Sequence, residues 1–243
     1  MFVNPTRNGG NSVVRRTKTD AAITREQLLD AAERVFRERG VTRTSLAEIA
    51  AAAGVTRGAV YWHFRDKADL FAAMCERATL PLEQTLERAG TAVHADALAA
   101  LRTLAIDALT RLACDARAQA VFEVVFHKCE LTDEIGPIAA RRNRERWHCL
   151  VHVEIIFRRA IELGQLPPDT DTRLATQALH AYIGGIMREW VLDPTAFDLA
   201  AMAPALIDTM IAGLAACPPR HADPLSARPR AIASGKPAPT TPA

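Results

Sequence analysis

Apolar side chains recur along most of this chain every three or four residues, which is the spacing of one face of an α-helix. Ala97, Leu101, Leu104, Ala108 and Leu112 give a clear example. Ala, Leu, Arg and Glu outnumber the strand-favouring Val, Ile and Thr over most segments, and 12 glycines and 14 prolines are few for an all-β chain. The sequence therefore predicts an all-α fold.

Capping residues predict where the first helices begin and end. Thr24 can cap a first helix that ends at Gly40. Ser45 and Glu48 form a second capping box, which opens a short helix that Gly54 closes. A third helix begins only two or three residues later, so the turn between these two short helices is tight.

Two short helices separated by a glycine turn are typical of a helix-turn-helix motif, whose second helix lies in the major groove of DNA. Here the second helix would run from Arg57 to Phe64, with Thr56 as its cap. Arg57, Gly58 and Tyr61 share one face near its start, the part that reaches base edges. Arg57 can pair bidentately with guanine, Gly58 lets the backbone approach, and Tyr61 can contact a thymine methyl group or a phosphate.

Three further features favour contact with DNA over a plain three-helix packing unit. His63 and Lys67 lie about a turn beyond Tyr61, where they can meet phosphates, and Lys67 opens a long fourth helix. Residues 1–67 carry a net charge of +5 and the remainder −3, so a polyanion would meet the N-terminal part. In addition, Tyr61, Trp62 and His63 are consecutive, and no single core-facing stripe can bury all three.

Composition limits the class of protein. The chain has 243 residues, of which 49% are hydrophobic and 24% charged, and this excludes disorder of the whole chain. The start lacks the apolar core of a secretion signal, and no run approaches the roughly 18 to 20 apolar residues that span a bilayer. Five cysteines without a CxxC pair argue for reduced, buried thiols. We expect a cytoplasmic protein with no membrane contact, with a flexible basic arm at 1–19 and a disordered Pro-rich tail at 217–243.

Three stretches of the N-terminal part resemble the TetR family of transcriptional repressors: residues 44–50 (TSLAEIA), 53–64 (AGVTRGAVYWHF) and 67–71 (KADLF). The resemblance covers about residues 15–71. It is greatest to the AcrR-like branch, which represses multidrug efflux pumps and shares the Arg-Arg-Thr-Lys start. Later segments similar to the ligand-binding half of that branch are 126–130, 164–167 and the run from Ala181 to Trp190.

The resemblance implies a helix-turn-helix domain at 20–71, joined by a long helix to a bundle at 72–216 that binds a ligand and forms a homodimer through the helices at 172–191 and 196–215. Each subunit would read half of a near-palindromic operator. Its implied phosphate contacts are Thr44 or Ser45, Thr56, Tyr61, His63 and Lys67. Its implied base contacts are Arg57, Gly58 and Tyr61.

The C-terminal half carries enough apolar surface either to close as a core or to enclose a cavity, and composition does not separate the two. Only the resemblance to drug-responsive repressors favours a pocket for a hydrophobic small-molecule inducer. Phe122 and Phe126 share one helical face, and another face carries residues from 180 to 187. The predicted lining is Phe122, Phe126, Val153, Phe157, His180, Ile183, Gly184 and Met187.

Two other functions stay open. One is a TetR-like regulator of metabolic genes that responds to a metabolite. The other is a metal-binding helical-bundle enzyme, since Glu145, His148 and His152 have compatible spacing on one helical face. A di-metal bundle needs a second such helix, and the chain has no nucleophile elbow, P-loop or dinucleotide fingerprint. We therefore expect a repressor rather than an enzyme, with no cofactor and no metal.

Overall fold

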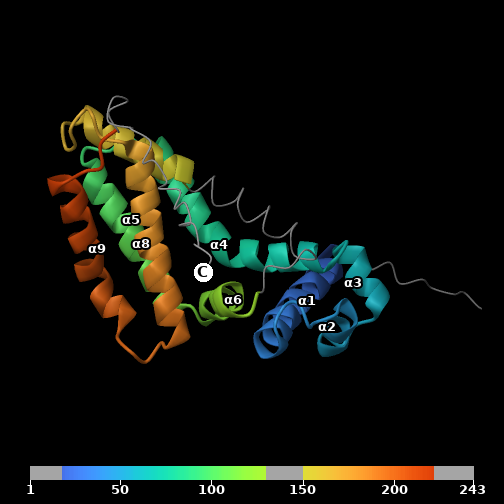
Figure 1. The fold of residues 1–243 in the computed structure, drawn as a ribbon. Coiled ribbons are helices and arrows are strands. Elements are labelled where there is room, and N and C mark those ends of the chain that lie inside the picture. The colour runs from blue at the N-terminus through green and yellow to red at the C-terminus, as the bar shows by residue number, and fades with distance from the viewer. Residues whose placement is uncertain (1–17, 130–149, 222–243) are drawn as a thin grey trace, which may run out of the picture.

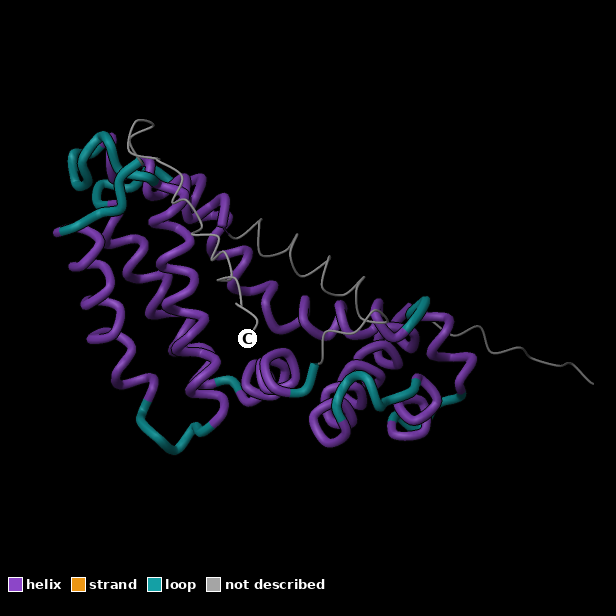
Figure 2. The backbone as a smooth tube through the Cα atoms, in the orientation of Figure 1, coloured by secondary structure: helices purple, strands orange, loops and turns teal. Residues whose placement is uncertain are grey.

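The computed structural model describes residues 18–129 and 150–221, which are coloured in Figure 1. Within these ranges the chain consists of helices joined by loops (Figure 2). One isolated antiparallel bridge joins Thr170 and Arg220. The predicted all-α fold is confirmed. The helices in chain order are α1 (Lys18–Arg39), α2 (Leu46–Ala52), α3 (Arg57–His63), α4 (Lys67–Thr91), α5 (Ala97–Cys114), α6 (Ala116–His127), a helix over residues 150–162, α8 (Thr172–Leu192) and α9 (Leu199–Ala216).

The short helices begin where their capping residues predict. The Ser45 side chain accepts a hydrogen bond from the backbone of Glu48 at 3.3 Å, and the Glu48 carboxylate accepts one from the Ser45 amide at 2.8 Å. Thr56 caps α3 by accepting from the Ala59 amide at 3.2 Å. Gly54 has a φ of +67°, which a residue with a side chain rarely adopts, and so closes α2 as predicted.

The predicted start of the first helix at Thr24 is wrong. α1 already begins at Lys18. The Thr24 hydroxyl donates to the carbonyl of Asp20 at 2.9 Å, one turn earlier in the same helix. A threonine that makes this bond lies inside a helix and does not cap its start.

We call α1, α2, α3 and the first half of α4 the N-terminal head, because they share one hydrophobic core. Phe36 and Phe71 meet edge to face at its centre, with ring centroids 5.9 Å apart. Val60 and Phe64, four residues apart, are also buried in it. The core also takes three residues from α6, a helix far along the chain: Val121, Val124 and Val125.

Helix α4 joins the head to the rest of the molecule and contains Pro81. Proline has no N–H to donate and crowds the carbonyl four residues earlier, so it bends a helix. The two halves of α4 run in different directions (Figure 1). Leu70 and Met74 lie in the head core, whereas Leu86 packs in a separate core.

We call α5, the helix over 150–162, α8, α9 and the second half of α4 the C-terminal bundle. Its apolar side chains form two cores, and the predicted stripe on α5 is buried. Helix α9 corrects the expectation about apolar runs, because its length and mean hydropathy of 1.7 would allow it to span a bilayer. Only 22% of it is buried in this chain, where it packs beside α5 (Figure 1).

The cysteines differ in part from the expectation that they are small buried residues. Cys75 is buried in the head core and Cys129 is partly buried beside it. Cys114 and Cys217 are exposed. Both exposed cysteines lie at the ends of helices, where the periodic apolar face has stopped. The prediction of burial is therefore wrong for these two residues.

Candidate nucleic-acid interface

A surface hollow of about 490 Å³ lies where the α1–α2 turn, the starts of α2 and α3, and the start of α4 converge. Its wall contains five of the eight residues predicted to contact DNA. Arg43 adds a further cation beside them. The residues that line the hollow are Thr42, Arg43, Thr44, Ser45, Leu46, Ala47, Arg57, Tyr61 and Lys67.

Arg57 and Tyr61 form the exposed side of this hollow. Nη2 of Arg57 donates to the Tyr61 hydroxyl oxygen at 3.1 Å, and the guanidinium carbon lies 5.5 Å from the centre of the Tyr61 ring. The hydrogen bond to Tyr61 raises the pKa of Arg57 above its ordinary value. The prediction that the two side chains share one face of α3 is confirmed.

Gly58 lies on the same exposed face. A Cβ atom added there would meet only the Thr56 hydroxyl oxygen, at 3.9 Å, an ordinary contact. The fold therefore does not require glycine at this position, although glycine inside a helix costs about 1 kcal/mol relative to alanine. That Gly58 lets the backbone of α3 approach DNA stays a prediction.

The remaining predicted contacts differ in how accessible they are. The Thr44 side chain is only 2% exposed, and its hydroxyl donates to the Gly40 carbonyl at 2.8 Å. Of the predicted pair, Ser45 is therefore the one with an exposed side chain. Lys67 lies at the start of α4 and donates from Nζ to the carbonyl of Thr42 at 3.1 Å. Thr56 is exposed at the cap of α3.

Trp62 is a candidate contact that the sequence reasoning did not assign. Its side chain is 73% exposed on α3, against 48% for Tyr61. Its ring packs edge to face on His63, which is partly buried, with centroids 4.6 Å apart. Three consecutive large side chains were the signal in the sequence, and the structure shows that Val60 and Phe64 occupy the core-facing positions instead.

The residues predicted to line a ligand pocket come together only in part. Phe122 and Phe126 of α6 stack with ring centroids 5.5 Å apart, and they pack against the core that holds Met187. Val153 and Phe157 belong to the neighbouring core. Ile183 packs against both cores.

His180 and Gly184 are not among the residues of these two cores. His180 is exposed, and a Cβ atom on Gly184 would meet no atom within 4 Å. Both lie on α8 one turn apart, on the side that continues to the exposed Arg188. The spacing of a helical face predicts which residues lie together, but it does not tell which neighbour that face meets.

The alternative metal site falls mostly outside the described residues, because it needs Glu145 and His148. Its third member, His152, lies on the helix over 150–162, where Nδ1 is buried without a hydrogen-bond partner in the described ranges. Among residues 18–129 and 150–221, no three His, Cys, Asp or Glu side chains are grouped as metal ligands would be.

The helix-turn-helix carries Arg43, Arg57 and Lys67 around one surface hollow. A basic face of this kind on a helix-turn-helix is typical of DNA-binding regulators. The profile of the bacterial regulatory proteins of the tetR family matches residues 28–74, and that of the C-terminal region of MAATS-type transcriptional repressors matches residues 96–215. The chain belongs to the TetR family of transcriptional regulators.

Individual relatives agree with this assignment. The transcriptional regulator TtgR of Pseudomonas putida is 38% identical over 197 residues, which are 81% of this chain and 94% of TtgR. The structure of NalD, described as the secondary repressor of the MexAB-OprM multidrug efflux pump in Pseudomonas aeruginosa, superposes with a TM-score of 0.74 at 38% identity and covers 80% of this chain and 98% of NalD. A triclosan complex of SmeT, the repressor of the SmeDEF multidrug efflux pump of Stenotrophomonas maltophilia, gives 0.71 at 35% identity, over 79% and 91% of the two chains.

Proposed function

We propose that this protein is a dimeric, cytoplasmic repressor of a multidrug efflux operon, released from its operator by a hydrophobic small molecule. The observation that carries the proposal is the face of α3, where Arg57 is held by Tyr61 beside a Gly58 that the fold does not need. Relatives named as efflux-pump repressors cover most of the chain and favour drug response over a metabolic role. By this proposal the domain at 20–71 reads DNA and the domain at 72–216 binds the inducer.

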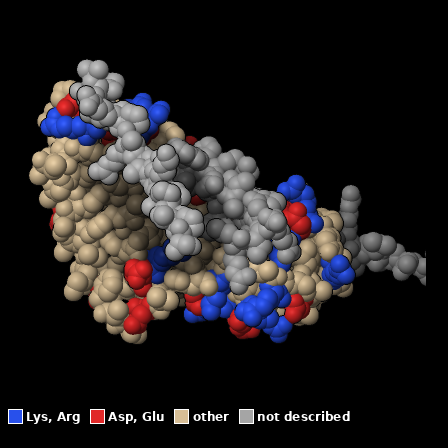
Figure 3. Space-filling model, in the orientation of Figure 1, with Lys and Arg blue, Asp and Glu red and all other residues tan. Residues whose placement is uncertain are grey.

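A homodimer is part of the proposal, and α9 supports it. The outward face of α9 carries small residues that permit close helix packing, and most of this apolar helix is not covered by its own chain. The visible surface of the C-terminal bundle is largely uncharged (Figure 3). Exposed residues on this face include Ala201, Ala205, Thr209 and Ala212.

Ala205→Glu tests this dimer, because a charge at the centre of a close apolar contact is costly to bury. Sedimentation velocity should show a monomer for the variant and a dimer for the wild type. Ala51→Glu, at an exposed position on α2 and outside the two helices of the expected dimer, is a matched charge control. A dimer that persists in Ala205→Glu would exclude α9 as the interface.

We place the inducer beside α6, where Phe122 and Phe126 stack between the two parts of the molecule. Arg188 lies 5.8 Å from the Phe126 ring centre, so one cation borders an otherwise apolar site. A ligand releases DNA only if it binds better to a conformation that fits the operator badly. A coupling of about 1 to 3 kcal/mol, which is typical of allostery, would weaken operator binding about 5- to 150-fold.

Fluorescence anisotropy tests the proposal with DNA from upstream of the gene and a scrambled control, at physiological salt. We expect specific binding in the range of about 10⁻⁸ to 10⁻¹¹ M. Triclosan, the compound bound to SmeT, is the first inducer to add. Equal, salt-sensitive binding to both DNAs would contradict the assignment of α3 as a sequence reader.

Phe122→Ala separates the inducer site from the DNA site. The variant should bind the operator as the wild type does but need more triclosan for release, because a half-buried ring in the proposed site is lost. Ile155→Ala, which removes an exposed apolar side chain from the helix over 150–162, is the control. Unchanged triclosan release from Phe122→Ala would place the inducer elsewhere.

A further inference from the structure

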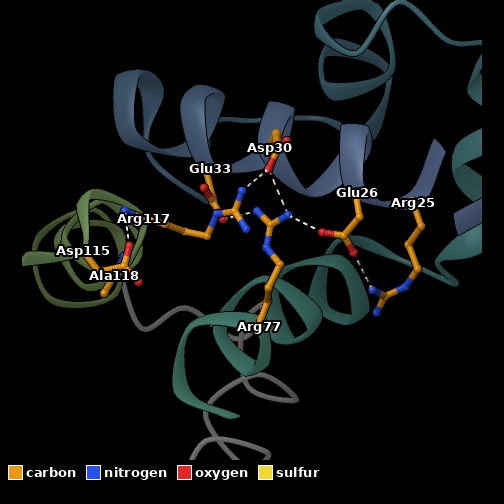
Figure 4. A network of polar contacts seen from close by, with 8 residues as sticks. All are labelled: Arg25, Glu26, Asp30, Glu33, Arg77, Asp115, Arg117 and Ala118. Carbon is orange, nitrogen blue, oxygen red and sulfur yellow. Dashed lines mark hydrogen bonds and ion pairs between the residues drawn. The ribbon is translucent and has the colours of Figure 1, made fainter. Parts of the chain in front are cut away.

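One arginine of α4 gathers three carboxylates of α1. Nη1 of Arg77 lies 2.8 Å from Oε2 of Glu26 and 2.9 Å from Oδ1 of Asp30, and Nη2 donates to Glu33 (Figure 4). The Arg77 side chain is only 13% exposed and that of Glu33 12%. Partial burial makes this pair costly to break, because a lone charge would be left with little water around it.

The cluster also includes α6. Arg117 in the first turn of α6 reaches Asp30, with Nη2 at 3.4 Å from the same Oδ1 atom that Arg77 binds. Asp115 caps α6 by accepting from the amides of Arg117 and Ala118, which fixes where this turn begins (Figure 4). We call Glu26, Asp30, Glu33, Arg77 and Arg117 the three-helix cluster, since it ties α1, α4 and α6 at one point.

The position of Arg77 on α4 is as informative as its partners. Pro81 lies four residues later, so the carbonyl of Arg77 lacks the N–H that would bond to it in a regular helix. The helix before this point packs in the head core and the helix after it packs in the C-terminal bundle. The cluster therefore holds the last turn of α4 that belongs to the head, directly before the bend.

A second connection runs from α6 to the surface hollow that Arg57, Tyr61 and Lys67 line. The amide of Val41 donates to the carbonyl of Lys128, the C-cap of α6, at 3.0 Å. Val41 precedes Thr42, whose carbonyl accepts the bond from Lys67 in the wall of the hollow. Between α1 and α6 lies a groove of about 520 Å³ with mainly charged walls, and Arg37 of α1 pairs across it with Glu123 of α6.

We propose that Arg77 is a positioning residue for DNA reading, which fixes the orientation of the N-terminal head relative to the C-terminal bundle. In a dimer this orientation sets the separation of the two α3 helices and so the half-site spacing that the protein accepts. The inference rests on the proposed function, since it requires a dimer on a two-part operator. Arg77 does not line the surface hollow of Arg57 and Lys67, so its effect passes through α1 directly and through α6 by way of Asp30 and Arg117.

The test measures tolerance of half-site spacing. One base pair added or removed between the half-sites rotates them by about 34° and shifts them by about 3.4 Å. For wild type we expect a loss of affinity of about tenfold or more on either altered operator, within the range of typical coupling. Arg77→Met should reduce this loss of affinity at least about threefold. Without the three-helix cluster, the N-terminal head can change its orientation and bind the displaced half-site.

Two variants control for misfolding and for loss of a charge. Asp30→Asn keeps the shape of a side chain that is about half exposed and weakens the bonds to both Arg77 and Arg117, so it should also reduce the penalty while the protein stays folded. Arg159→Met removes an ion pair within a single helix and should leave the penalty unchanged. The salt dependence of operator binding should be the same in all variants, because no phosphate contact is removed.

The outcomes separate the two proposals. A wild type that binds operator and scrambled DNA equally overturns the proposed function, and the positioning role falls with it. A wild type with a clear spacing penalty that stays unchanged in both Arg77→Met and Asp30→Asn overturns the positioning role alone. A reduced penalty in both variants, with melting curves showing folded protein, supports it.

Discussion

The guanidinium group of Arg57 lies against the ring of Tyr61 one turn further along α3 and donates to its hydroxyl oxygen at 3.1 Å. Both side chains are exposed, so this contact restricts their rotamers without burying them. A side chain already ordered before binding loses less conformational entropy when it meets its partner. In the proposed complex, the pair would present an ordered donor to the DNA.

Replacing Arg57 and Lys67 separately should distinguish base reading from phosphate contact. Arg57→Ala should cost about 1 to 3 kcal/mol and relax specificity at one position in each half-site. Lys67→Ala should weaken binding to all sequences alike and lower the salt slope by about one. Anisotropy titrations on the operator, single-base variants and random DNA give these quantities. Equal losses for Arg57→Ala on operator and random DNA would contradict its base-reading role.

Gly58→Ala should separate stability from DNA binding. An alanine in this exposed helical position should stabilise the protein by about 0.5 to 1 kcal/mol, since the added methyl group meets only Thr56 at 3.9 Å. Operator affinity should nevertheless fall, because the methyl group holds α3 away from the groove. Urea unfolding and anisotropy on the same preparation measure the two effects. Undiminished operator binding would show that α3 does not approach DNA at Gly58.

Gly90→Ala should have the opposite effect on stability, although Gly90 also lies in a helix. A Cβ atom there would lie 2.8 Å from Nδ1 of His152 and 3.1 Å from its Cβ, where α4 meets the helix over 150–162. Overpacking of this kind costs about 1 to 3 kcal/mol.

His152→Ala provides the control for this contact. In that background Gly90→Ala should be tolerated, because the crowding side chain is gone and the two changes are coupled. Thermal or urea unfolding of the two single variants and the double variant completes the cycle. If Gly90→Ala costs the same in both backgrounds, the contact with His152 is not the cause.

The parts of the fold that sequence could predict are those fixed by neighbours in the chain. The capping box at Ser45, the left-handed Gly54 and the exposed face of α3 each depend on residues within one or two turns. These local signals were enough to locate the helix-turn-helix. Thr24 misled because a threonine inside a helix and one at its cap have the same sequence context when the preceding residues also favour a helix.

The unpredicted parts depend on contacts between distant residues. Nothing local in α6 indicates that Val124 enters the head core, or that Arg77 meets a carboxylate 44 residues earlier at Glu33. Helical spacing likewise predicted that His180 and Met187 lie on one side of α8, but not that Met187 is buried and His180 exposed. Which face of a helix is buried depends on the elements packed against it, and these are distant in the sequence.

The pH dependence of stability should reflect carboxylates whose pKa values shift in opposite directions. Hydrogen bonds from the Ala99 amide and Gln165 lower the pKa of Asp96 below its ordinary value, and hydrogen bonds from Ser45 do the same for Glu48. A carboxylate whose pKa is lowered in the folded state stabilises the protein at pH values above its unfolded pKa. This stabilisation is lost as the pH falls through the folded pKa. These groups should therefore make the free energy of unfolding decrease below about pH 4.5.

Glu33 should oppose that trend. Burial raises the pKa of Glu33 above the ordinary value despite the bond from Arg77. As the pH falls, Glu33 is therefore protonated at a higher pH in the folded state than in the unfolded state. Its contribution is fully present below the unfolded pKa and is lost as the pH rises through the folded pKa. Urea unfolding between pH 2.5 and 7 should give a shallower acid loss for Asp96→Asn and a steeper one for Glu33→Gln. Parallel pH profiles for wild type and both variants would contradict these assignments and attribute acid unfolding to other carboxylates.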